Sequence, residues 1–322
     1  MGRRYASPRW PAVTAAAWWL AAACFWAGGA GAALFWPESA AATEAQDGRN
    51  AGGAPETDGQ SPPSGAPAAL RRVVTLAPHI TELIFAAGAG DRIVGTVDSS
   101  DYPPAARAIP RIGDGVSISV EQTVALRPQA VIAWLPTGSV RALTPALHRL
   151  GIALLYSQPL KLDDIPAEIA RYGRLFGTQG PAQAAAQALG RRIADLRQHY
   201  AGRAPVPVFI EIGSAPLFTI GRDPLLNDAL AACGGVNIYA GLPMPAARVN
   251  PESVLLENPQ VIIGPSAEPA ELKEIRSRWS TLRLPAATAG RVYGIDPDAL
   301  FRPGPRLVDA TEALCRYLDQ AR

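Results

Sequence analysis

Few side chains in this sequence are of the types that carry out acid–base or metal chemistry. The chain has three histidines, His79, His148 and His199. The last two fall in helical patterns, whereas His79 follows a short apolar run, where a residue at the edge of a cleft would lie. A zinc site needs three or four protein ligands, so one histidine does not predict a metal centre. A metal site would need His79 together with carboxylates such as Glu211 or Asp298.

The motifs of the common enzyme classes are missing from the chain. It has no G-x-S-x-G, no Walker loop, no H-E-x-x-H and no C-x-x-C. The run Gly88-Ala89-Gly90 follows a helical pattern instead of a strand, so it is a poor dinucleotide fingerprint. We therefore expect a binding protein and not an enzyme. An exported enzyme with an unrecognised site is the alternative.

Two glutamates occupy matching positions in a repeated segment. The copies run from Ser119 to Ile132 and from Asn250 to Ile263, with a constant offset. Each copy has a capping residue, a glutamate two positions later, a short helical stretch, Pro-Gln and an apolar strand. The helix dipole alone explains a carboxylate in a first helical turn. Alternatively, Glu121 and Glu252 are matched acids on two similar lobes that dock on a partner with two basic sites.

The elements that must position these residues are arranged around one long helix in the middle of the chain. Apolar residues recur there in steps of three and four, at Ala186, Leu189, Ile193, Leu196 and Tyr200. We interpret this helix as a strut between two similar lobes, with an ordinary crossover helix as the alternative.

Short apolar runs alternate with helical patterns on both sides of this helix. The runs span residues 72–77, 93–97, 130–135, 152–156, 208–212, 218–221, 261–264 and 291–295. This alternation predicts parallel sheets with helices on both faces. The predicted fold class is α/β, with two Rossmann-like lobes (70–180 and 202–322) joined by a single backbone helix (181–201).

The first 69 residues predict export and a tether. Three arginines precede an apolar stretch over residues 12–36, and small residues follow. We expect residues 1–42 to be a signal peptide. The alternatives are an uncleaved membrane anchor and lipidation at Cys24. Residues 43–69 are rich in Gly, Pro, Ser, Ala and acidic residues, so we expect a disordered linker.

Charge and cysteine content constrain the partners and the compartment. The formal net charge is +2 and the chain has no long basic run, so we expect no nucleic-acid partner. Without Cys24, two cysteines remain, Cys233 and Cys315. An even count in an exported protein favours a disulfide, and two buried free thiols are the alternative. The disulfide would close a loop of roughly 80 residues and stabilise the fold by about 4 kcal/mol.

The chain resembles a known family from Val73 to its C-terminus. The supporting runs are Thr75–Pro78, Thr81–Leu83, Ser100–Pro104, Val131–Trp134, Pro216–Thr219, Cys233–Ile238 and Gly304–Arg306. They resemble the periplasmic solute-binding proteins of ABC importers, in the helical-backbone group (class III) that serves vitamin B12, siderophores and haem. The resemblance implies a monomeric periplasmic carrier without a resident cofactor or metal. Such a carrier would capture a corrinoid between its lobes and deliver it to permease subunits in the inner membrane.

The resemblance also implies a ligand set. Tyr102 and Trp134 would pack on the corrinoid from the N-terminal lobe, Phe218 from the C-terminal lobe, and Asp298 and Arg302 would supply polar groups beside it. Without the family, the tryptophan and the phenylalanine are equally well explained as core aromatics. The aspartate and the arginine would then form a surface salt bridge of small value.

Two further pairs take their roles from the resemblance. It implies that Glu121 and Glu252 dock on arginines of the permease. It also implies that Cys233 and Cys315 form the disulfide of the family.

The chain departs from the vitamin B12 branch in two loops. That branch carries a tryptophan in the loop occupied here by Gly113-Asp114-Gly115 and another in the loop occupied by residues 243–248. Large aromatics contribute much of the apolar contact to a bulky ligand. Because both tryptophans are absent here, we expect the ligand to be either vitamin B12 itself or a related corrinoid, such as cobinamide or another cobamide. An iron siderophore or haem is the second candidate ligand, and a metal ion is the third.

Overall fold

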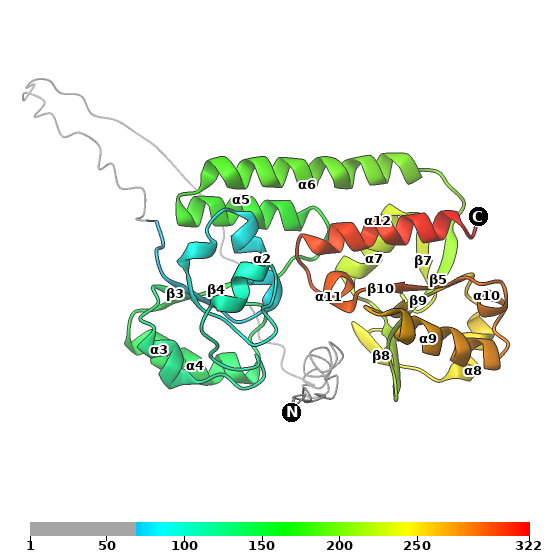
Figure 1. The fold of residues 1–322 in the computed structure, drawn as a ribbon, viewed down its shortest axis with the longest axis horizontal. Coiled ribbons are helices and arrows are strands. Elements are labelled where there is room, and N and C mark those ends of the chain that lie inside the picture. The colour runs from blue at the N-terminus through cyan, green and yellow to red at the C-terminus, as the bar shows by residue number, and fades with distance from the viewer. Residues whose placement is uncertain (1–68) are drawn as a thin grey trace, which may run out of the picture. The chain divides into compact units, whose positions relative to one another are not determined.

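A computed structural model describes residues 69–322 (Figure 1). The predicted leader, the lipidation site Cys24 and the linker up to residue 68 lie outside the described residues. Within residues 69–322, no helix combines the length and the apolar character needed to cross a bilayer.

The N-terminal lobe is built on a parallel sheet with the strand order β2-β1-β3-β4. Its strands are β1 (Val73–Thr75), β2 (Ile93–Gly95), β3 (Ala130–Ala133) and β4 (Ala153–Tyr156). Its helices are α2 (Pro78–Ala86), α3 (Val120–Ala125), α4 (Gly138–Arg149) and α5 (Asp164–Phe176), with 3-10 helices η1 (Gly90–Arg92) and η2 (Pro104–Ala108). The central strands β1 and β3 are buried along their whole length, as expected for a parallel sheet that is covered on both faces.

The C-terminal lobe has a mixed sheet with the order β10-β9-β5-β6-β8, and β7 pairs with β5. Its strands are β5 (Val206–Ser214), β6 (Leu217–Ile220), β7 (Gly235–Asn237), β8 (Ala246–Arg248), β9 (Val261–Pro265) and β10 (Val292–Ile295). Its helices are α7 (Pro224–Ala232), α8 (Pro251–Glu257), α9 (Pro269–Thr281), α10 (Pro285–Thr288), α11 (Pro297–Leu300) and α12 (Arg306–Asp319).

The predicted parallel pairing is wrong for β6, and β8, which the sequence did not predict, is antiparallel as well. β6 pairs antiparallel with β5, and β8 pairs antiparallel with β6. Only Ala215 and Pro216 separate β5 from β6. A connection this short can join only antiparallel neighbours, because parallel strands need a crossover of a dozen or more residues.

The long central helix is α6 (Gln179–Tyr200), which begins two residues before the predicted start. Its buried face carries Ala182, Ala186, Leu189, Ile193 and Tyr200. This face packs on α5 of the N-terminal lobe and on α7 and α12 of the C-terminal lobe (Figure 1). The strut therefore contributes to the cores of both lobes.

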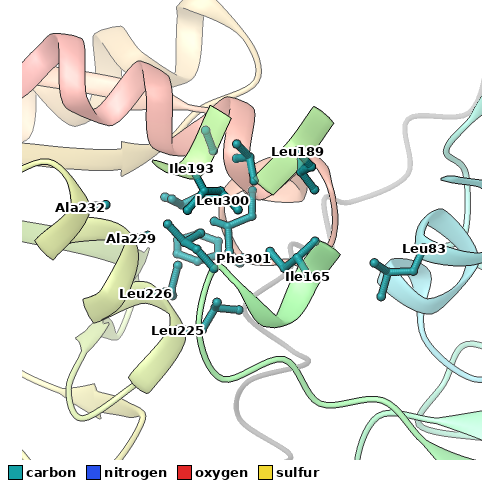
Figure 2. Close-up of a cluster of buried hydrophobic side chains, with 14 of the residues drawn as sticks. Leu83, Ile165, Leu189, Ile193, Leu225, Leu226, Ala229, Ala232, Leu300 and Phe301 are labelled. Atoms are coloured by element: carbon teal, nitrogen blue, oxygen red, sulfur yellow. The ribbon is translucent and has the colours of Figure 1, made fainter. Parts of the chain in front are cut away.

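One hydrophobic core continues beneath α6 from lobe to lobe. It includes Leu83 and Ile165 from the N-terminal lobe and Leu226, Leu300 and Phe301 from the C-terminal lobe (Figure 2). All five side chains are buried. Sliding the lobes past each other would expose this apolar surface, so the shared core resists such a motion.

The repeated segment folds in the same way in each lobe, which confirms the repeat. The side chains of Ser119 and Asn250 cap α3 and α8, and each accepts a hydrogen bond from the amide three residues later. Each helix is followed by a residue with a φ of 46°, Arg127 in one lobe and Asn258 in the other. The next strands, β3 and β9, then pair in parallel with β1 and β5.

The predicted disulfide between Cys233 and Cys315 is present, and both cysteines are fully buried. It links the end of α7 to α12 across a sequence separation of 82 residues. A cross-link of this span restricts the unfolded chain and contributes about 4 kcal/mol to stability in the chain-entropy model.

Candidate ligand-binding cleft

A cavity of about 190 Å³ is lined by residues from both lobes. The N-terminal lobe supplies Trp134 and Leu135 after β3 and residues 158–160 after β4. The C-terminal lobe supplies residues 223–226 at the start of α7 and residues 300–303 at and after the end of α11, together with Pro245. The positions after β3 and β4 follow the carboxyl ends of parallel strands, where ligand sites of α/β folds form.

Trp134 forms part of the N-terminal wall of the cavity and rests on His79. Their ring centroids are 5.2 Å apart, and the rings meet edge to face at 76°. His79 is buried, and this burial lowers the pKa of its imidazole to about 3. The imidazole is therefore neutral at physiological pH, and His79 supports the tryptophan without adding charge to the cleft.

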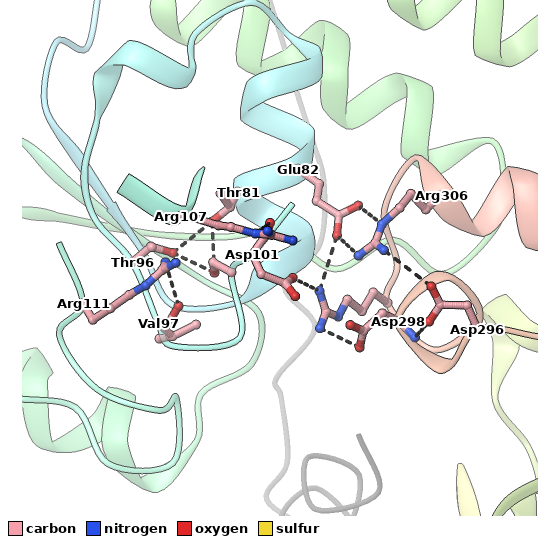
Figure 3. A network of polar contacts seen from close by, with 12 residues as sticks. Thr81, Glu82, Thr96, Val97, Asp101, Arg107, Arg111, Asp296, Asp298 and Arg306 are labelled. Atoms are coloured by element: carbon pink, nitrogen blue, oxygen red, sulfur yellow. Dashed lines mark hydrogen bonds and ion pairs between the residues drawn. The ribbon is translucent and has the colours of Figure 1, made fainter. Parts of the chain in front are cut away.

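A network of ion pairs joins the lobes beside the cavity (Figure 3). The Nη1 atom of Arg302 lies 3.1 Å from the Oδ1 atom of Asp101 and 3.7 Å from the Oε1 atom of Glu82, both in the N-terminal lobe. Its Nη2 atom lies 2.6 Å from the Oδ1 atom of Asp298 in its own lobe. Arg306 donates two hydrogen bonds to the Glu82 carboxylate, at 3.0 and 2.7 Å.

Glu82 is the most buried carboxylate of this network, with only 3% of the residue exposed. Burial raises the pKa of its carboxyl group, whereas Arg306 and Arg302 act in the opposite direction. The backbone of Gly304 lies directly over α2: a Cβ atom at that position would be 3.4 Å from Glu82 Oε2 and from the Cβ of His79. The segment from 302 to 306 is thus a close contact between the lobes.

The structure brings only part of the implied ligand set to the cavity. Trp134 and Arg302 line it, and Asp298 lies beside the arginine without lining it. Tyr102 is 45% exposed and lies under the guanidinium of Arg306, which is 4.5 Å from the ring centroid. Phe218 lies on β6, half-buried against the hydrophobic core, and does not line this cavity.

Asp223 is a cavity residue that sequence reasoning missed. It caps α7 by accepting a hydrogen bond from the amide of Leu226 at 2.7 Å. Burial raises the pKa of its carboxyl group to about 6. The dipeptide Asp223-Pro224 was an available signal, because aspartate at an N-cap followed by proline marks a helix start.

Glu82, Asp101 and Arg306 were also missed as site residues. The two partners Glu82 and Arg306 are 224 positions apart in the sequence. No local pattern links residues at that separation, so only the folded chain reveals their contact.

The carboxylates suggested as metal ligands have other partners. Glu211 on β5 accepts a hydrogen bond from the indole nitrogen of Trp279 at 2.8 Å and pairs with Arg278. Asp298 pairs with Arg302. Over residues 69–322, no three or more His, Cys, Asp or Glu side chains are grouped to hold a metal ion.

The two matched acids lie at equivalent exposed positions. Glu121 is in the first turn of α3 and Glu252 in the first turn of α8. Both helices lie away from α6, one in each lobe (Figure 1).

A family model described as "Periplasmic binding protein" matches residues 73–299. The chain belongs to this family. Vitamin B12-binding proteins of Vibrio cholerae serotype O1 and Photorhabdus laumondii are each 34% identical to it. The match covers 80% of this chain and 92% of the first relative, and 78% and 89% for the second.

Solved structures give the same picture of the fold. The periplasmic vitamin B12 binding protein BtuF of Vibrio cholerae is 33% identical, with a TM-score of 0.71 over 78% of this chain and 98% of that one. The periplasmic haem-binding protein RhuT from Roseiflexus sp. RS-1 is 25% identical, with a TM-score of 0.67 over 78% and 99%. The predicted family and fold class, an α/β periplasmic binding protein with a helical backbone, are confirmed.

Proposed function

We propose that this protein is the solute-binding component of an ABC importer and that it captures a corrinoid, vitamin B12 or a close relative. The observation that carries the proposal is 34% identity to vitamin B12-binding proteins across 80% of the chain. A cavity that both lobes line at the ends of parallel strands supports it.

Binding is non-covalent and uses apolar walls. Trp134 covers one side of the ligand, and Leu225, Leu226 and Phe301 face it from the other lobe. Such walls are typical of small-molecule sites, in which a few polar groups fix the orientation of the ligand. Arg302 supplies a polar group at this cavity.

The ligand extends beyond the cavity, because typical ligand sites measure roughly 300–1,000 Å³ and this cavity only about 190 Å³. Exposed apolar side chains continue from its lining: Leu160 is itself a lining residue, and Met244 is next to the lining residue Pro245. Tyr102 lies on the neighbouring ion-pair network. A large ring system that covers these exposed apolar side chains would remove their surface from water, which favours binding.

Delivery uses the matched acids. Glu121 and Glu252 dock on basic groups of the permease, one from each lobe, outside the inner membrane. Their exposure and equivalent placement support this role. Charge pairs of this kind fix the orientation of a partner and speed its encounter.

Haem is the second candidate ligand, since the haem-binding protein RhuT has the same fold at 25% identity. The higher identity to the vitamin B12-binding proteins favours the corrinoid. Isothermal titration of the full chain in mild detergent with cyanocobalamin, cobinamide and haemin separates the two. Sub-micromolar binding of a corrinoid, and weaker binding of haemin, is the expected result. If haemin binds tightly and no corrinoid binds, the ligand is haem and not a corrinoid.

A further inference from the structure

Arg302 is the only basic residue among the described residues that line the cavity. Three carboxylates already surround its guanidinium within 4 Å, those of Asp298, Asp101 and Glu82. Its side chain is only 13% exposed. A ligand anion that reaches this guanidinium would lie next to these three carboxylates.

The neighbouring guanidinium of Arg306 is committed as well. It donates two hydrogen bonds to Glu82, lies 4.0 Å from a carboxylate oxygen of Asp296, and covers the ring of Tyr102. Arg107, the next base along this network, donates to the main-chain carbonyl of Asp101. The three arginines of this network are therefore already engaged within the protein.

Acidic oxygens, in contrast, remain accessible. The side chains of Asp101 and Asp298 are 47% and 33% exposed beside Arg302. Asp223 also lines the cavity, but it is only 7% exposed and its Oδ1 atom caps α7. A ligand with N–H donors can bond to such oxygens without breaking an ion pair, and hydrogen bonds to charged acceptors are among the stronger ones.

We propose that the acidic surplus of the cleft selects the charge of the ligand. Neutral or cationic ligands rich in carboxamide donors bind, whereas ligands that bring carboxylates are rejected. Asp101 and Asp298 are the specificity-determining residues. This inference rests on the proposed function, because it concerns the same cleft, and it names the ligand class: a corrinoid with intact amide side chains in preference to an anionic tetrapyrrole or an anionic iron chelate.

The test compares ligands that differ by one charge. Cyanocobalamin and its separated monocarboxylic acids, in which one side-chain amide is hydrolysed, have nearly the same size and shape. Titration calorimetry with the full chain should show at least one acid isomer binding about tenfold more weakly than the amide, the effect of one like charge at close range in a partly wet site. At 0.5 M salt this ratio should shrink, because exposed charges are screened.

The variant Asp101→Asn, Asp298→Asn should reduce the ratio to less than about threefold by strengthening the binding of the acid. The control is Asp91→Asn, which neutralises an exposed aspartate that takes no part in the ion pairs of Arg302 and pairs with its neighbour Arg92. The control should keep the tenfold ratio.

The outcomes separate this inference from the proposed function. If every acid isomer binds within twofold of the amide, or if the double variant leaves the ratio unchanged, charge selection is wrong and corrinoid binding stands. If haemin, which carries two propionate carboxylates, binds more tightly than any corrinoid, both proposals are wrong. If neither haemin nor any corrinoid binds, the proposed function fails and charge selection among corrinoids fails with it.

Discussion

Replacing Arg306 with alanine should destabilise the protein far more than removing an exposed arginine. Arg306 donates two hydrogen bonds to Glu82, whose side chain is only 2% exposed. Without these bonds, the guanidinium that remains near Glu82 among the described residues is that of Arg302, whose Nη1 atom is 3.7 Å from the carboxylate. Removing one partner of a buried ion pair costs about 3–5 kcal/mol. Because one base remains, we expect the lower end of that range, about 3 kcal/mol.

Arg192→Ala is the matched control. Arg192 also forms two ion pairs, with Asp309 and Glu312, but its side chain is 39% exposed and the pairs are solvated. Exposed pairs contribute roughly 0.2–1 kcal/mol each. Urea unfolding of both variants at pH 7.5, with the disulfide intact, measures the difference in the free energy of unfolding.

Lowering the pH should reverse part of the loss in Arg306→Ala. Burial raises the pKa of Glu82, and Arg306 opposes this rise, so its removal raises the pKa further. The folded variant then binds a proton more tightly than the unfolded chain does, and its stability relative to the wild type increases as the pH falls from 7.5 to 5. A loss no larger than that of Arg192→Ala, or a loss that is equal at both pH values, would refute the proposal of a buried, charged Glu82.

Three further predictions follow from the cleft, the acids and the disulfide. Trp134→Ala should weaken binding of cyanocobalamin at least tenfold in calorimetry, whereas Phe218→Ala should change the affinity less than threefold. A larger effect of Phe218→Ala than of Trp134→Ala would show that the ligand binds outside this cavity. The double variant Glu121→Ala, Glu252→Ala should keep its affinity within twofold but reduce corrinoid uptake by cells; lost affinity in a folded variant would contradict the docking role. Replacing both cysteines of the disulfide with alanine should lower the free energy of unfolding by about 2–5 kcal/mol in urea titrations, and an unchanged midpoint would show that the cross-link is dispensable.

Sequence reasoning worked best where local chemistry fixes an element. The short helix predicted after Asn250 in the second copy of the repeat is α8 (Pro251–Glu257), because Asn250 caps it and proline occupies its first turn. The strut was predicted to within two residues from its apolar period. The strands β7 (Gly-Val-Asn) and β8 (Ala-Ala-Arg) were missed, because neither lies in a run of large apolar residues like those of the predicted strands.

The site was less predictable, because it is made of contacts between distant parts of the chain. Trp134 and Arg302 were expected from the family resemblance, and both line the cavity. The roles of Glu82 and Arg306 depend on the docking of the two lobes, which leaves no periodic trace in the sequence. The resemblance placed Phe218 in the ligand set, whereas in this structure it does not line the cavity. Whether it contacts a ligand stays a prediction.

A crystal structure of the protein grown with cyanocobalamin tests the central claim most directly. We predict a corrin ring between the lobes, in contact with Trp134 on one side and with residues of the 300–303 segment on the other. Its amide side chains should point at Asp101 and Asp298. An empty cleft at saturating ligand, or a corrinoid bound on a surface away from Trp134, would contradict the account.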